Sequence, residues 1–181
     1  MSISRIFNHS TFANSTLMGL AALIGGFSIA FFTLDNQGAV YITQDSIATG
    51  PDSVMGLATL VVTLFSLLCS FICFMGDYVN YRGWSPVPRA SMLRQGLIIA
   101  ARYGLTVFVV MISFGVLWQR FFEALQVSAL FGAGFIAILS GMAGFYIALS
   151  LKGEYRNYVY RSITPRPAQL HALASCKPIY R

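Results

Sequence analysis

The residues that could do chemistry in this chain are few, and the first candidates are thiols. Cys69 and Cys73 lie four apart inside an apolar run, and Cys176 lies near the C-terminus. Their spacing is not a CxxC motif, and the chain has two histidines, so the sequence indicates neither a metal centre nor a thiol-redox site. We interpret the cysteines as small packing residues and expect no catalytic residue, metal or cofactor.

Two charged residues lie within or beside the apolar runs. Arg102 is inside the run at 96–118, and Asp77 directly follows the run at 54–76. A short antiparallel connection would bring these two segments together, so we expect Arg102 to pair with Asp77 or with a lipid phosphate. No second ionisable group lies at depth, which argues against a proton pump and leaves no axial histidines for a b-type haem.

Hydroxyl groups follow a helical line along the run at 54–76, at Thr59, Thr63, Ser66 and Ser70. Such a stripe can line a pore or face another helix, although hydroxyls in membrane helices commonly bond to their own backbone. A channel or transporter path along this run is therefore an alternative.

Small residues recur at four-residue spacing in the first and last apolar runs. Such rows form one stripe of a helix and let two backbones approach closely, which is a main source of helix association in lipid. We expect the rows to pack the chain's own helices or, in the sharper interpretation, to hold a partner. They comprise Ala22, Gly26 and Ala30 in the first run and Ala133, Ala137, Gly141 and Gly144 in the last.

Composition identifies the elements that position these residues. Of 181 residues, 56% are hydrophobic and 10% are charged, whereas a typical soluble domain has about 25% charged residues. Four runs reach the roughly 20 residues that a membrane helix needs, at 15–34, 54–76, 96–118 and 125–151. We predict an all-α integral membrane protein with four transmembrane helices in an antiparallel bundle. The membrane domain covers 1–151, and a basic tail covers 152–181.

Positive charges predict the orientation. The loop at 35–53 contains three aspartates and no lysine or arginine, whereas 77–95 contains three arginines and the tail six basic residues. Basic residues stay on the cytoplasmic side, so we predict that both termini are cytoplasmic. The membrane would be a bacterial inner membrane or an equivalent plasma or organellar membrane. Residues expected to dock lipid headgroups or a partner are Arg82, Arg89, Arg94, Arg156 and Arg161.

The function that this pattern favours is a non-catalytic integral membrane subunit or accessory protein of a larger complex. Expected partners are membrane lipids and other membrane subunits or a second copy, but not nucleic acid, because topology and lipid account for the basic residues. Two alternatives are an oligomeric channel or transporter and a small immunity-type protein that blocks a pore-former by helix contact. A lipid-acting enzyme is a third alternative. Its polar candidates at the cytoplasmic interface are Asp77, Tyr78, Asn80, Arg82 and Arg102.

Overall fold

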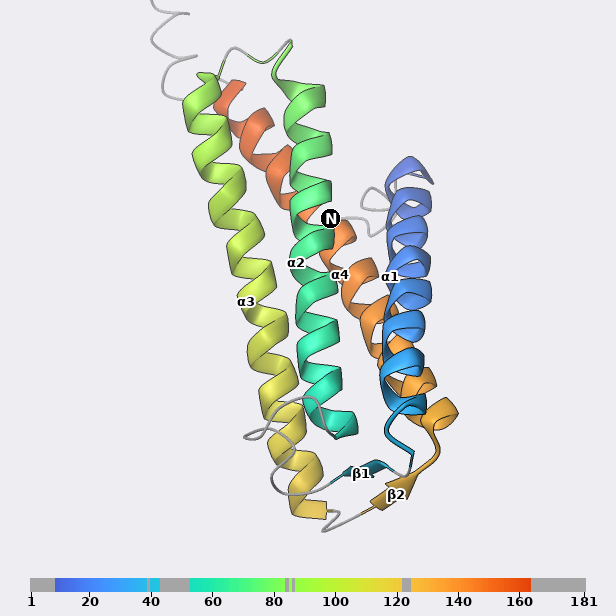
Figure 1. The fold of residues 1–181 in the computed structure, drawn as a ribbon. Helices are drawn as coiled ribbons and strands as arrows, with labels where there is room; N and C mark the ends of the chain where they lie inside the picture. Colours follow the sequence, from blue (N-terminus) through green and yellow to red (C-terminus); the bar gives the residue numbers. More distant parts are fainter. Residues whose placement is uncertain are drawn as a thin grey trace, which may run out of the picture.

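Four helices dominate the computed structural model of the protein, which describes residues 9–38, 40–42, 53–83, 85, 87–121 and 125–163. They are α1 (His9–Asp35), α2 (Val54–Tyr81), α3 (Arg89–Phe121) and α4 (Ala129–Ile163) (Figure 1). Each is long and apolar enough to cross a membrane. The length and hydropathy of these helices confirm the prediction of a helical, multi-pass membrane protein with four candidate spanning helices.

Each helix extends beyond the apolar run that predicts it. Helices of 27 to 35 residues are about 40–50 Å long, which exceeds the roughly 30 Å hydrocarbon core of a bilayer. Local capping sets some of the ends: the Ser53 hydroxyl accepts from the Gly56 amide at 3.2 Å, and the Ser128 hydroxyl accepts from the Phe131 amide at 3.3 Å. The helices are therefore longer than an untilted crossing of the hydrocarbon core requires.

Two short strands, each from a segment that connects two helices, pair at one end of the bundle. Strands β1 (Val40–Ile42) and β2 (Leu125–Val127) pair antiparallel, with Tyr41 opposite Gln126. The prediction that the last membrane helix begins at residue 125 is wrong, because residues 125–127 form a strand that pairs with β1. A segment of three residues is too short for its alternation of apolar and polar side chains to distinguish a strand from the apolar start of a helix. The sheet joins the end of α1 to the start of α4. We call this end of the bundle the sheet end.

Helix α4 connects the bundle, because it contacts each of the other three helices and packs most extensively against α1. Helix α2 packs against α3 and α4, whereas its contact with α1 is much smaller. In Figure 1, α4 accordingly passes behind α2 toward α1. The largest buried side chains come from all four helices and include Leu34, Phe74, Met92 and Tyr155.

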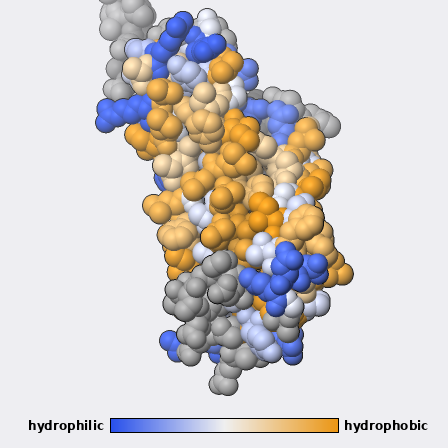
Figure 2. Space-filling model, viewed as in Figure 1, coloured by the Kyte–Doolittle hydropathy of each residue, from blue (hydrophilic) through white to orange (hydrophobic). Residues whose placement is uncertain are grey.

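The outside of the bundle is apolar across its middle. Figure 2 shows hydrophobic side chains over the central part of the visible face and hydrophilic ones toward both ends. Every helix exposes large apolar side chains there, for example Leu17, Leu64, Leu105 and Met142. A soluble protein of this size rarely exposes so continuous an apolar surface, whereas a bilayer would cover it.

The predicted boundary between membrane domain and tail lies inside a helix. Helix α4 runs without a break from Ala129 past residue 151 to Ile163. Predictions that fall on residues 164–181, including those about Cys176, lie outside the described residues, as does the segment 1–8.

Candidate functional site

The small-residue rows meet where α1 packs against α4. A methyl group built at Gly26 would lie 2.6 Å from the Ser140 hydroxyl oxygen, and one built at Gly144 would lie 2.9 Å from Ala22 Cβ. Such distances leave no room for a larger side chain. All members of the two rows are buried: Ala22, Gly26, Ala30, Ala133, Ala137, Gly141 and Gly144. These residues hold the chain's own helices together and leave no exposed surface of their own.

Contacts along this seam run in opposite order on the two helices. Gly19, early in α1, faces Gly141, whereas Leu34, late in α1, faces Gly132. Residue numbers on α4 therefore fall as those on α1 rise.

A second close approach, between α2 and α3, was not predicted. A methyl group at Gly96 would overlap the Phe74 ring, and one at Gly104 would lie 2.7 Å from Leu67 Cδ2. Here each glycine packs against a large side chain rather than against another small residue. Gly96 and Gly104 lie eight residues apart, which places them on one stripe of α3, and this spacing is the signal that could have found them.

Arg102 has a different partner from the one expected. Its guanidinium forms an ion pair with the Glu154 carboxylate, and the Tyr103 hydroxyl donates to the same carboxylate at 2.9 Å. The expected pair of Arg102 with Asp77 is therefore wrong. Arg102 is exposed and Glu154 is half-buried, so the pair lies at the surface of the bundle.

The register between α2 and α3 explains this correction. Because Gly104 meets Leu67 and Gly96 meets Phe74, Arg102 lies level with about residue 69 of α2. Asp77 is roughly eight residues farther along α2, which is about 12 Å along the axis. Glu154 was missed because the pair depends on how α3 and the part of α4 beyond residue 151 lie against each other, which no local sequence pattern shows.

Asp77 instead lies buried among α1, α2 and α4. Its side chain is 5% exposed, and its Oδ2 atom has no hydrogen-bond partner among the described residues. Lys152 and Arg156 of α4 are the cations that interact with it electrostatically. Cys73 lies one turn before Asp77 on the same stripe of α2. The structure thus places a carboxylate inside the bundle with an oxygen free to accept a hydrogen bond.

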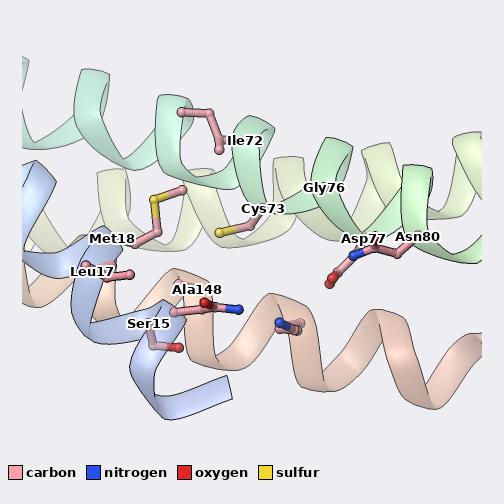
Figure 3. A pocket seen from close by; sticks show the side chains of 11 residues that line it. Ser15, Leu17, Met18, Ile72, Cys73, Gly76, Asp77, Asn80 and Ala148 are labelled. Atoms are coloured by element: carbon pink, nitrogen blue, oxygen red, sulfur yellow. The ribbon is translucent and has the colours of Figure 1, made fainter. Parts of the chain in front are cut away.

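A cavity of about 300 Å³ opens beside this carboxylate. Figure 3 shows Asp77 pointing from α2 toward α4, with the Cys73 side chain on the same side and Met18 entering from α1. We call this space the Asp77 cavity. Its polar lining consists of Asn14, Ser15, Asp77, Asn80 and Lys152, and its other lining residues are Leu17, Met18, Ile72, Cys73, Gly76 and Ala148.

Basic residues gather at the same end of the bundle. The Tyr155 hydroxyl of α4 donates to the Met92 carbonyl of α3 at 3.3 Å, and the Tyr155 ring packs on Phe74 of α2. The end of α2, the start of α3 and the end of α4 therefore lie together, and we call this the basic end. The predicted docking arginines that lie there are Arg82, Arg89, Arg94 and Arg161, which are exposed, and Arg156, which is half-buried.

The hydroxyl stripe of α2 faces the interior of the chain. Ser66 and Ser70 are buried, and the Thr59 and Ser66 hydroxyls donate to backbone carbonyls of α2 itself, at 2.9 and 2.6 Å. This is the usual behaviour of hydroxyls in membrane helices. Cys69 is also buried, and within the described ranges no three His, Cys, Asp or Glu side chains lie together.

Two apolar grooves flank the outward face of α4. One, of about 410 Å³, lies between α1 and α4, and the other, of about 390 Å³, lies among α2, α3 and α4. Met142 lines both grooves, and it is 65% exposed. The exposed ridge of α4 therefore has a hollow on each side.

Comparison of the chain with models of protein families, with curated proteins and with solved structures finds no match.

Proposed function

We propose that this protein is a non-catalytic integral membrane subunit or accessory protein of a larger membrane complex. The observation that carries the proposal is the pair of apolar grooves on either side of Met142. Helices in lipid associate by close packing of complementary surfaces, and a ridge between two hollows can interlock with a partner's helix. A smooth lipid-facing helix would offer no such shape.

The partner surface that we propose differs from the one expected from sequence. The small-residue rows are buried between α1 and α4, so the partner would contact the exposed stripe of α4 formed by Phe131, Ile138 and Met142. These residues are seven and four positions apart, which places them on one side of a helix. The arginines of the basic end would add contacts with a partner's acidic loops or with lipid phosphates.

The proposed topology is an antiparallel bundle with both termini in the cytoplasm, in a bacterial inner membrane or an equivalent membrane. The opposite order of contacts along the seam between α1 and α4 supports antiparallel helices. The charge distribution supports the orientation, because the basic end carries five exposed or half-buried arginines. At the sheet end the charged residues in the described part of the chain are Asp35 and Arg120.

A channel lined by α2 has less support, because Ser66 and Ser70 are turned into the chain's own interior. Cysteines introduced at these two positions should react slowly with aqueous thiol reagents, whereas one at exposed Gly83 should react fast. The immunity-type alternative would use the same face of α4 and differs only in the partner.

The test of the proposal is extraction of the tagged full-length protein in a mild detergent, followed by native mass determination and identification of bound proteins. We expect a foreign membrane subunit in stoichiometric amount. This foreign subunit should be lost from the variant Met142→Trp, in which the larger side chain fills the grooves. It should remain bound to the control variant Leu64→Trp, which alters an exposed position on α2. Extraction of a homo-oligomer without a foreign subunit would overturn the proposal.

A further inference from the structure

The Asp77 cavity holds groups of opposite charge that do not satisfy each other. Asp77 Oδ2 lacks a hydrogen-bond partner, and no ion pair joins Asp77 to Lys152 in the part of the chain that the structure describes. A buried carboxylate without a matching donor is costly, because it has lost its water. A ligand that brings a donor to Asp77 would offset this cost.

We propose that the Asp77 cavity binds the headgroup of a membrane phospholipid with a primary amine, of the phosphoethanolamine type. The ammonium of the headgroup donates to the Asp77 carboxylate, and the phosphate accepts from Lys152. A zwitterion thus places each of its charges against the opposite charge of the cavity, and the side chains of Asp77 and Lys152 need not contact each other.

The walls of the cavity indicate a lipid rather than a soluble amine. Leu17 of α1 and Ile72 of α2 line it, and their side chains are 65% and 47% exposed on the outside of the bundle. These residues belong to α1 and α2, two helices that contact each other little. Acyl chains can therefore leave the cavity between these two helices and enter the bilayer, while the volume of about 300 Å³ holds the polar part of the lipid.

The polar lining favours a primary over a quaternary amine. A primary ammonium has three N–H donors, and the side-chain oxygens of Asn14 and Asn80, which line the same cavity, offer further acceptors. Trimethylated amines are recognised by aromatic rings, and the described lining of this cavity contains none. A headgroup with a phosphate and no amine would leave Asp77 without a donor.

The experiment uses the full chain purified alone, so it does not depend on the partner proposed above. The protein in detergent is titrated with dioleoyl phosphatidylethanolamine, its N,N-dimethyl derivative, phosphatidylcholine and phosphatidylglycerol, and bound lipid is counted by native mass spectrometry. We expect at least tenfold tighter binding of the ethanolamine lipid than of the choline lipid, with the dimethyl lipid between them. Equal binding of these lipids to the wild-type protein would overturn the proposal.

Variants locate the site. Asp77→Asn keeps the shape of the side chain and removes its charge, and we expect it to abolish the preference for ethanolamine lipid. Asp35→Asn makes the same change at the sheet end and should leave the preference intact. Lys152→Gln should weaken the binding of ethanolamine lipid and of phosphatidylglycerol alike. Arg161→Gln, on the same helix but outside the cavity, should leave the binding of both lipids unchanged. Unchanged preference in Asp77→Asn would overturn the assignment to this cavity.

A last arm separates the lipid from its soluble headgroup. Glycerophosphoethanolamine carries the same charges without acyl chains, so we expect it not to displace the lipid at equal concentration. Displacement at equal concentration would assign the cavity to a soluble metabolite and overturn the lipid assignment.

Discussion

At the scale of single residues, the size of a side chain decides how closely α1 and α4 approach. Gly26 lies against Ser140, and Gly144 lies against Ala22, so both helices contribute small groups to one seam. In lipid there is little hydrophobic drive to bring helices together, and van der Waals contact between close backbones takes its place. An added methyl group in this seam therefore pushes the helices apart.

The first prediction concerns this seam. Gly26→Ala places a methyl group 2.6 Å from the Ser140 hydroxyl oxygen, so we expect a loss of about 1–3 kcal/mol in the free energy of unfolding. The matched control is Gly134→Ala on α4, where the added methyl meets nothing within 4 Å. The control should be neutral or stabilising by up to about 1 kcal/mol. Unfolding by SDS titration in mixed micelles measures both, and equal stability of the two variants would contradict the packing described here.

The second prediction concerns the ion pair at the basic end. Arg102 pairs with Glu154 and not with Asp77, so a double-mutant cycle of Arg102→Gln with Glu154→Gln should show coupling. The cycle of Arg102→Gln with Asp77→Asn should show additive effects, because these residues lie at different depths. The coupling should be small, because both side chains of the observed pair are partly exposed and water screens them. Coupling only with Asp77 would restore the pairing expected from sequence.

At the scale of elements, the sheet end sets how α1 and α4 are joined. The strands β1 and β2 come from connections that lie more than eighty residues apart in the chain. Val40 and Ile42 are buried and Tyr41 is exposed, which is the alternation of a strand with one covered face. The sheet fixes the end of the seam and so limits sliding of α1 along α4.

The third prediction tests the register of this sheet. In a background without native cysteines, Tyr41→Cys and Gln126→Cys should form a disulfide under mild oxidation, because these residues are direct partners. Opposite residues in an antiparallel pair have Cα atoms about 4.5–5.5 Å apart, which suits a disulfide. Tyr41→Cys with Ser128→Cys is the diagonal control, at about 7–8 Å. Faster cross-linking of the diagonal pair would show a different register.

The elements follow from the sequence more readily than the contacts between them. Four long apolar runs predict four helices, because length and hydropathy are properties of a continuous segment. The partner of Arg102 depends on the register of three helices, which no local pattern encodes. The burial of Asp77 likewise follows from its place on the stripe of α2 that contains Cys69 and Cys73 and faces α1 and α4. The strand at 125–127 was missed since its pairing partner is distant in sequence.

At the scale of the whole molecule, charge and polarity are distributed unevenly between the two ends. The predicted docking arginines, the Arg102–Glu154 pair and the Asp77 cavity all lie at or near the basic end. The middle of the bundle presents apolar side chains to the outside (Figure 2). Orientation in the membrane therefore decides which compartment meets the arginines and from which leaflet a lipid can enter the cavity.

The most direct test of the account is the accessibility of single cysteines at the two ends. In a background without native cysteines, Asn36→Cys and Gln126→Cys represent the sheet end, and Gly83→Cys and Arg161→Cys represent the basic end. All four positions are exposed. In intact cells, a membrane-impermeant maleimide should label the sheet-end pair at once and the basic-end pair only after permeabilisation. Labelling of the basic-end pair from outside, or of one member of either pair without the other, would contradict the four-span bundle with both termini in the cytoplasm.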